Sequence, residues 1–577
     1  MATQQEEEEA KLERFLQWLQ VNGVELRGCK IKHCDSKGFG IFSAANQASD
    51  GVLLVDPFDL AITPMRVLQD SLLGPECRAM FEGEVDDRFL MNLFLTLERL
   101  RKNSSWKPSW LNSFGVGDRI RYLDMLPTSF GNPLWFTDDE LLELKGTTLY
   151  RATELQKKKL QTLSDDNVKP LVKNLLTLDG DSESEVCFED FLWENSVFWT
   201  CTLNIPLPHS YVFPQTQEED SNFATTKDSE LCTNYISNGE DVKGKDLLIS
   251  GCRVQNVDSQ VNGVTSTAIQ GETIWVEGLV PGIDFCNHDL KAAATWEVDR
   301  TGSITGVPFS MYLLSSEQSL FETKREISIS YSYKGNEELI YLYGFVIDNN
   351  PNDYLMAIQS VPFSDSKVQL LEAQKAELRC LLPRSLLDRG FFSEWTAKIE
   401  GNDKCEDQVC SHSWSGQRKM PSYLNKLVFP DNFLTALRTI ALQEDEIFQV
   451  SSMLEELVGS GGERQPSDTE VRAAVWEACG DSGALQLLID LLQMKMVDLE
   501  ENSRAEDCDI ELLKEVNTTE SQELQTPIKE TDGLTQQKLR SKNRRSSIIY
   551  RRGQKQLTRL FLKEAEHALQ LAFSERN

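Results

Sequence analysis

The order in which β-type and helical patterns follow one another constrains the fold of this chain more than any other feature. Residues 52–55 form an apolar, strand-like run, and residues 327–331 alternate with a period of two. Between these runs, residues 89–100 repeat apolar side chains with helical spacing. After about residue 356 the patterns are mostly helical. We therefore expect an α+β fold, in which a β-rich part is interrupted by helices and followed by an all-helical part.

The changes of pattern also predict the domain boundaries. A chain of 577 residues is too long for one ordinary core and suggests two or three domains. An amphipathic helix comes first, because Leu12, Phe15 and Leu19 fall on one side of a 3.6-residue repeat. The predicted parts are an N-terminal helix over 1–24, a β-rich domain over 25–355 with a helical insertion at about 66–200 and a polar mobile loop at about 216–272, and a helical domain over 356–577 with a polar linker at about 500–540.

The charge balance limits the class of partner. The formal net charge of −32 argues against direct nucleic-acid binding, because a phosphate backbone would be repelled. It is compatible with a basic protein partner attracted by the acidic field. The alternative is that acid-rich loops only keep the protein soluble.

Cysteine usage and hydropathy indicate an intracellular protein without a membrane span. The thirteen cysteines lack regular spacing, which fits reduced thiols. No run of 18 or more apolar residues is present. The acidic start of the chain is the reverse of an organellar transit peptide. We expect a cytoplasmic monomer; a basic stretch over 538–555 leaves nuclear import as the alternative.

The first motif is Gly38-Phe39-Gly40. Two glycines let a backbone approach a ligand closely or adopt a positive φ, although this motif alone is more typical of an ordinary tight turn between strands. The motif lacks the third glycine and the following helix of a dinucleotide site. No cluster of histidine and cysteine has the spacing of tetrahedral metal ligands, so we expect no metal site.

Two later motifs are more informative. Asn287-His288 ends an apolar run, and Asp284 lies three residues before it. Tyr331 precedes a Tyr343-Gly344-Phe345 motif. Taken singly, the first could be a hydrogen-bonded turn and the second part of an aromatic core.

Taken together and in this order, the motifs resemble those of SET-domain protein methyltransferases. More narrowly, the chain resembles the branch that contains the plant ribulose-bisphosphate carboxylase large-subunit N-methyltransferase and related lysine and actin-histidine methyltransferases. The helical stretch between the early and late motifs resembles the inserted subdomain of that branch, with Trp106-Lys107-Pro108 and Leu126-Pro127 as markers. The resemblance covers roughly residues 20–500 and the last helix. The helical C-terminal part resembles the substrate-binding domain of these enzymes.

The resemblance implies a protein-lysine N-methyltransferase that uses S-adenosyl-L-methionine and acts on a lysine of a non-histone protein. It implies Tyr331 as the catalytic residue. It assigns the cofactor to Lys37, Gly38, Phe39, Asn287, His288 and Phe345. It assigns the substrate to Asp284, Trp296 and Tyr343.

The chemistry of methyl transfer is compatible with these roles. A free lysine has a pKa of about 10.4, and a dry aromatic channel lowers it by disfavouring the ammonium. Alignment of the two reactants supplies much of the remaining acceleration.

One position departs from the family pattern. Cys201 stands where the plant enzyme has an arginine that contacts the carboxylate end of the cofactor. Losing a charge-assisted hydrogen bond costs roughly 1.5–3 kcal/mol. A SET-fold binding module with weak catalysis is therefore one alternative, and methylation of a histidine is another.

Overall fold

A computed structural model of the chain describes residues 4–34, 37–44, 50–70, 73–81, 86–103, 119–178, 180–181, 183–212, 273–315, 325–356, 364–376, 381–393, 422–458, 464–523 and 532–574. The chain divides into two compact units. The first unit contains Met1–Ser129 and Leu155–Tyr331, and the second contains Phe130–Glu154 and Ser332–Asn577. The units thus divide the chain differently from the predicted boundary at residue 355. The predicted loop at 216–272 and the marker Trp106-Lys107-Pro108 lie outside the described residues.

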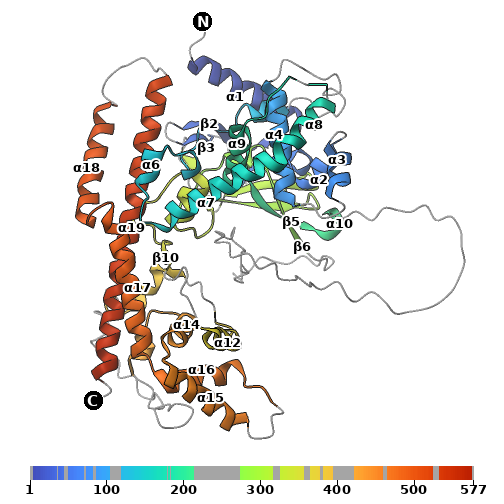
Figure 1. Ribbon diagram of the computed structural model, residues 1–577. Helices are drawn as coiled ribbons and strands as arrows, with labels where there is room; N and C mark the ends of the chain where they lie inside the picture. Colours follow the sequence, from blue (N-terminus) through green and yellow to red (C-terminus); the bar gives the residue numbers. More distant parts are fainter. Residues whose placement is uncertain are drawn as a thin grey trace, which may run out of the picture. The chain divides into compact units, whose positions relative to one another are not determined.

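Small antiparallel sheets form the β-rich part of the first unit. Figure 1 labels several of their strands. One sheet has the order β1-β4-β8-β7, another has the order β2-β3-β9, and β5 pairs with β6. The strands are β1 (Glu25–Leu26), β2 (Cys29–Cys34), β3 (Gly38–Ser43), β4 (Val52–Pro57), β5 (Leu203–Pro208), β6 (Thr273–Gly278), β7 (Ala294–Asp299), β8 (Ser310–Ser315) and β9 (Glu326–Ile327).

The strand β4 is buried along most of its length because it lies between two other strands. It pairs with β1 on one side and with β8 on the other, where Val55 lies opposite Tyr312. Five of its six residues are buried, so its sequence reads as a continuous apolar run. The exception to this apolar character is Asp56, whose exposure is 0%.

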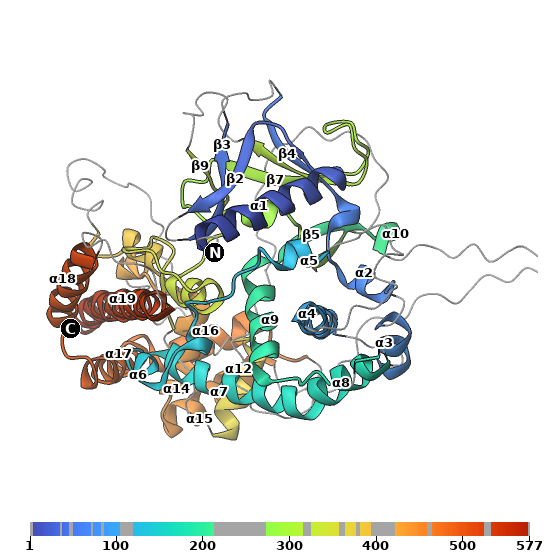
Figure 2. The same ribbon diagram turned by 90° about the horizontal axis from the view of Figure 1, so that it is seen from above.

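Helices cover the rest of the first unit. The predicted N-terminal helix is α1 (Gln4–Val21), which buries Phe15 and Leu19. The apolar periodicity at 89–100 forms α4 (Asp87–Asn103), which lies beside α9 in Figure 2. The other helices of this unit are η1 (Phe58–Leu60), α2 (Pro64–Leu68), α3 (Leu73–Phe81), α5 (Arg119–Leu123), η4 (Ser164–Val168), α8 (Lys169–Leu178), α9 (Phe188–Cys201), α10 (His209–Val212) and η5 (Ile283–Phe285). The helix α7 (Thr148–Leu163) begins in the second unit and ends in the first.

The predicted strand over 327–331 is only partly correct. Only Glu326–Ile327 form a strand, β9, and Ile329 makes an isolated bridge to His288. The alternation in the sequence is not an alternation in burial, since Ile327, Ser328 and Ile329 are all buried and Ser330 is exposed. The backbone meanwhile leaves β3 to reach the Asn287-His288 segment.

The second unit is mostly helical, and from α14 onward every described element is a helix. The predicted capping box at Thr137–Glu140 opens α6, where Thr137 N donates to Glu140 Oε2 at 2.8 Å. Before α14 a two-stranded ribbon joins β10 to β11. The elements are η3 (Pro133–Trp135), α6 (Asp138–Leu142), α11 (Asn336–Glu338), η6 (Leu339–Tyr343), β10 (Tyr354–Met356), α12 (Asp365–Ala373), β11 (Leu381–Pro383), η7 (Arg384–Arg389), η8 (Ser422–Lys426), α14 (Asp431–Ala441), α15 (Glu444–Val458), α16 (Asp468–Cys479), α17 (Ser482–Glu501), α18 (Glu506–Glu523) and α19 (Asp532–Ser574).

The predicted polar linker at about 500–540 is wrong where the structure describes it. Residues 506–523 form α18, and α19 begins at Asp532. Although α18 is largely polar, it buries Leu513 and Val516 in a cluster with Ile548 and Ile549 of α19. The apolar stripe is narrow and lies among polar residues, so the composition of α18 does not reveal it.

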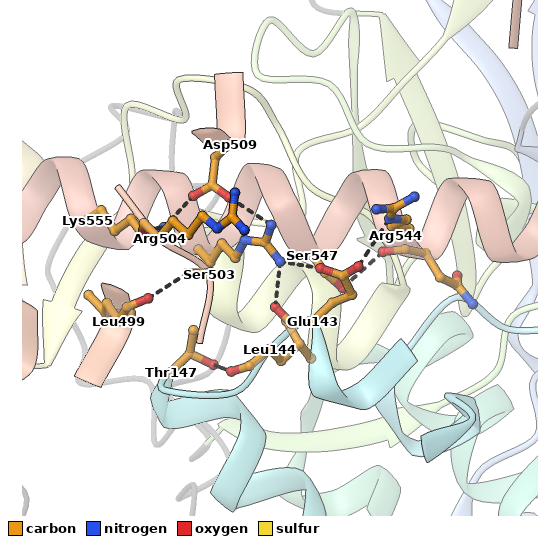
Figure 3. A network of polar contacts seen from close by, with 12 residues as sticks. Glu143, Leu144, Thr147, Leu499, Ser503, Arg504, Asp509, Arg544, Ser547 and Lys555 are labelled. Atoms are coloured by element: carbon orange, nitrogen blue, oxygen red, sulfur yellow. Dashed lines mark hydrogen bonds and ion pairs between the residues drawn. The ribbon is translucent and has the colours of Figure 1, made fainter. Parts of the chain in front are cut away.

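A buried ionic network holds α18 against α19 (Figure 3). Asp509 accepts from Lys555 Nζ at 2.6 Å and from Arg551 Nε at 2.7 Å. Lys555 and Asp509 both have side-chain exposures of 0%. Arg551 extends the network to Glu143, which follows α6, and donates to its backbone oxygen at 3.1 Å.

Candidate active site

The segment Asn287-His288 lies against the segment that follows β9. His288 and Ile329 form an isolated parallel bridge. Ile329 N donates to Asn287 O at 3.0 Å, and Asp289 N donates to Ile329 O at 3.2 Å. Two pieces of chain that are about forty residues apart in sequence are therefore fixed in register beside each other.

This register brings Tyr331 onto the Asn287-His288 segment. Tyr331 N donates to His288 Nδ1 at 3.1 Å, and Tyr331 Oη donates to Cys286 O at 2.8 Å. The two rings lie 5.2 Å apart between centroids and are tilted by 34°. The backbone and the hydroxyl of Tyr331 are thus both held by the same short stretch, and its ring has a defined orientation.

Asn287 connects this stretch to the Gly38-Phe39-Gly40 turn. Asn287 Nδ2 donates to Phe39 O at 3.2 Å and to Glu326 Oε1 at 2.7 Å. A side chain at Gly40 would be crowded, because a Cβ there would lie 3.0 Å from Asn287 Nδ2. Gly38 has a φ of +82°, and no atom lies within 4 Å of a Cβ built there. The early and late motifs therefore meet, with open space beside Gly38.

Lys37 belongs to the same group of side chains. Its Nζ forms an ion pair with Glu326 Oε2 at 2.8 Å. Glu326 thus joins Lys37 and Asn287, a role that nothing in the sequence pattern indicates. The sequence analysis did not identify Glu326, because this residue lies in a two-residue strand that has no motif of its own.

Burial sets the protonation of His288. It lowers the pKa of the imidazole, and Lys37 acts in the same direction. Because Nδ1 accepts the hydrogen bond from Tyr331 N, a neutral ring carries its proton on Nε2. His288 is therefore a neutral donor through Nε2 near pH 7.

Asp284 forms the other side of this region and has an unforeseen partner. Tyr122 donates from its hydroxyl to Asp284 Oδ2, and Gly282 N donates to Oδ1 at 3.1 Å. Burial raises the pKa of the Asp284 carboxyl to about 7. Burial also raises the pKa of the Cys201 thiol, and the charge of Asp284 raises it further. The charge of Asp284, a candidate substrate residue, therefore acts on the thiol of Cys201.

Three further predicted site residues are each described within their own unit. Trp296 is half-buried in β7, where it pairs with Leu313 of β8. Tyr343 and Phe345 belong to the second unit, and their ring centroids lie 6.2 Å apart. Gly344 between them has a φ of +74°, and a Cβ there would lie 2.7 Å from Gly131 C, so only glycine fits. The structure thus shows the local geometry of this motif within the second unit.

The described residues contain neither a metal-binding cluster nor a membrane-spanning helix. No group of three or more His, Cys, Asp or Glu side chains in this part of the chain could hold a metal ion. Among the helices described, none combines the length and the apolar character that crossing a bilayer requires.

Comparison with known proteins identifies the fold. No family model matches the chain. The crystal structure of the SET domain of LSMT bound to lysine and AdoHcy superposes with a TM-score of 0.55 and 16% sequence identity, covering 97% of this chain and 92% of that chain. The chain has the SET fold. This result agrees with the α+β class and with the resemblance inferred from the three motifs.

Curated relatives of this SET-fold chain are protein lysine and histidine N-methyltransferases. The chloroplastic [fructose-bisphosphate aldolase]-lysine N-methyltransferase of Arabidopsis thaliana is 28% identical over 31% of this chain and 33% of its own length. The ribosomal lysine N-methyltransferase of Schizosaccharomyces pombe is 24% identical over 62% and 52%. The human actin-histidine N-methyltransferase is 24% identical over 33% and 30%. The chain thus spans about a third to about a half of the length of these relatives.

Proposed function

We propose that this SET-fold chain is an S-adenosyl-L-methionine-dependent protein-lysine N-methyltransferase that acts on a non-histone protein. The observation that carries the proposal is the meeting of Tyr331, Asn287-His288 and the Gly38-Phe39-Gly40 turn in one place. The SET fold and the methyltransferase relatives support it. We keep the cytoplasm as the expected compartment and a basic, lysine-containing protein as the expected partner.

The residues around the Gly38-Phe39-Gly40 turn offer the polar atoms that S-adenosylmethionine would need. The space beside Gly38 and the closeness of Gly40 to Asn287 form a cradle that a Cβ would narrow. Lys37, Asn287 and the neutral His288 offer polar atoms around it, and Phe39 offers a ring. When bound, the cofactor supplies an electrophilic methyl group on a sulfonium.

Within this cradle the chain's own residues have separate tasks. Asn287 fixes the turn through Phe39 O, and the bond to Glu326 fixes Asn287 in turn. Cys286 O fixes the hydroxyl of Tyr331. Oxygen atoms held in this way suit the partial positive charge of a methyl group in transfer, because they need no reorganisation during the reaction. We assign Tyr343 and Phe345 to the walls of the substrate channel from the resemblance alone.

Histidine methylation is the second candidate. It is favoured by the actin-histidine N-methyltransferases among the relatives. A histidine nitrogen is largely neutral near pH 7, whereas a lysine nitrogen must first lose a proton. The two reactions therefore make different demands on the acid–base groups of the site.

A SET-fold binding module with weak catalysis is the third candidate. Its basis is Cys201, a neutral thiol at the position where the resemblance places an arginine. A thiol cannot replace a guanidinium against a carboxylate, so weak cofactor binding would follow.

The test is a methyl-transfer assay with labelled S-adenosylmethionine, the full chain and fractionated cell proteins, followed by mass spectrometry of the modified residue. We expect label on a lysine of a protein that is not a histone. Label only on histidine would support the second candidate. If no methyl group is transferred at saturating cofactor, the proposed enzyme activity is rejected and the third candidate, the binding module, is supported.

A further inference from the structure

A cavity of about 490 Å³ lies in the second unit, beside the ionic network of Figure 3. Its lining comes from α6 and the residue after it, from the link between α17 and α18, and from α18 and α19. All of these residues belong to the second unit. None of the residues proposed for catalysis, cofactor or substrate is among the described residues that line the cavity, so methyl transfer does not account for it.

Exposed carboxylates surround the cavity. Asp139 of α6 and Glu511 and Glu515 of α18 line it and are exposed. Because Glu511 and Glu515 are four residues apart, they lie on the same side of α18, about 6 Å apart along its axis. Arg504 is the exposed cation of the lining. Three exposed carboxylates against one exposed guanidinium leave an excess of negative charge at the surface of the cavity.

The less exposed charges of the lining are already paired, and they show how this region binds a guanidinium. Arg551 donates to Glu143 and, from Nε, to Asp509 Oδ1 at 2.7 Å. Arg544 Nε donates to the other oxygen of Glu143 at 3.1 Å (Figure 3). Glu143 therefore holds two guanidinium groups at once through charge-assisted hydrogen bonds. The exposed acids remain as the charged groups that a ligand can meet.

An apolar surface accompanies the acids. Leu142 exposes 52% of its surface and lines the cavity together with the half-buried Leu512. The methylene stem of a long basic side chain covers such a surface while its charged end stays at the carboxylates. A bare metal ion or a small ammonium ion would leave both leucines uncovered. The lining therefore fits a cation that carries an aliphatic chain.

We propose that this cavity is a docking site for an arginine-bearing segment of a partner protein. A guanidinium suits it better than an ammonium, because its five donors can meet carboxylates of α6 and α18 together. A peptide segment suits it better than free arginine, because each exposed carboxylate contributes little alone, whereas linked arginines engage several at once. The net charge of −32 also attracts a basic chain. The inference does not depend on the proposed methyl transfer.

The probe is a fluorescently labelled, amidated pentapeptide in which two arginines alternate with glycines. Its neutral counterpart has citrulline in place of arginine, which keeps the shape of the side chain and removes its charge. We expect the arginine peptide to bind the full chain saturably, measured by fluorescence anisotropy at constant ionic strength. The citrulline peptide should bind about tenfold more weakly or worse, since charged hydrogen-bond partners are lost.

Paired variants test whether the binding occurs at this cavity. Glu511→Gln combined with Glu515→Gln should weaken binding of the arginine peptide about threefold to thirtyfold, because two exposed partners lose their charge. The matched control combines Asp490→Asn with Asp507→Asn, which removes the same net charge from exposed positions of α17 and α18 outside the lining. We expect the control to leave the affinity unchanged.

A further variant fills the cavity without removing an acid. Leu142→Arg places a guanidinium of the chain itself beside the carboxylates, so it should weaken binding of the peptide at least as much as the loss of the two acids. Equal binding of the two peptides, equal losses in the lining and control variants, or no saturable binding would each overturn the proposal. Free arginine amide or spermidine that binds as tightly as the peptide would instead identify a small-molecule site and also overturn it.

Discussion

At the scale of single residues, the hydroxyl of Tyr331 has its direction fixed by a backbone oxygen. The hydroxyl donates to Cys286 O, and the ring lies against His288. Replacing this tyrosine by phenylalanine keeps the ring contact and removes only the oxygen. The substitution therefore separates the role of the hydroxyl from the role of the ring.

We expect Tyr331→Phe to lower the rate of methyl transfer about 10²- to 10³-fold, because one preorganised polar group is lost from the site. Initial rates with labelled cofactor measure the effect. The control is Tyr312→Phe, which removes another buried tyrosine hydroxyl, bonded to Glu297 at 2.7 Å, within the same unit. Equal rates in the two variants would contradict a catalytic role for Tyr331.

Cys201 permits a gain-of-affinity experiment. An arginine at this position would meet the negative charge that Asp284 already exerts on the thiol. We expect Cys201→Arg to raise the affinity for S-adenosylmethionine about tenfold to a hundredfold, by restoring a charge-assisted contact to the cofactor carboxylate. Calorimetry measures it, and Cys201→Met serves as the uncharged control of similar length. An unchanged dissociation constant would show that residue 201 does not face the cofactor.

At the scale of elements, the turn between β7 and β8 depends on one carboxylate. Asp299 Oδ1 accepts from Gly302 N at 2.8 Å, and Oδ2 accepts from Ile304 N at 2.9 Å and from Thr305 N at 2.8 Å. These backbone hydrogen bonds lower the pKa of Asp299 to about 2 against the opposing effect of burial. The Asp299 carboxylate thus accepts hydrogen bonds from backbone N–H groups that would bond to backbone carbonyl oxygens in a tighter turn.

The depressed pKa predicts a specific loss of stability in acid. Because the folded pKa lies below the unfolded one, the contribution of Asp299 is complete above about pH 4 and is lost as the pH falls towards 2. It amounts to about 2 kcal/mol. Urea unfolding of the wild type and of Asp299→Asn should differ by this amount near neutral pH and converge near pH 2. A difference that does not depend on pH would contradict the assignment.

The α18–α19 contact makes a separate prediction. Asp509→Asn leaves Lys555 and Arg551 buried against a neutral side chain, which should cost about 3–5 kcal/mol. Hydrogen exchange should show α18 losing protection first. Glu506→Gln, which breaks the more exposed ion pair between Glu506 of α18 and Arg559 of α19, should cost about 1 kcal/mol or less. Similar losses of unfolding free energy in both variants would mean that the buried network stabilises the α18–α19 contact no more than the exposed pair does.

These elements show what sequence patterns can and cannot predict. Periodicity was sufficient for α1, α4 and β4, because each buries one face or one run of apolar residues. The motifs were sufficient to foresee that Tyr331 and Asn287-His288 meet. Periodicity failed for α18, whose apolar stripe is too narrow to stand out. It also could not reveal the bonds of Glu326 and Tyr122, since tertiary contacts between distant polar side chains leave no local signal.

At the scale of the whole molecule, the net charge of −32 is the dominant property. A field of this size should attract a basic protein and repel an acidic one. We expect kcat/KM for a basic protein substrate to fall about tenfold between about 0.05 and 0.3 M NaCl, as ions screen the attraction. A short neutral peptide around the same lysine is the control. Salt dependence that is equal for both substrates would contradict electrostatic steering.

The second unit has a consequence for how the protein is made. Its segment Phe130–Glu154 is held by residues near the other end of the chain: Asn543 Nδ2 donates to Glu140 Oε1 across 403 positions, and Tyr550 Oη lies 3.3 Å from Thr148 Oγ1 across 402. A ribosome exposes the early segment long before it synthesises α19. At about 5–20 residues per second, the wait lasts roughly 20 to 80 seconds. During that interval the apolar side chains of residues 130–154 lack their final partners, which makes this segment the natural target for a chaperone.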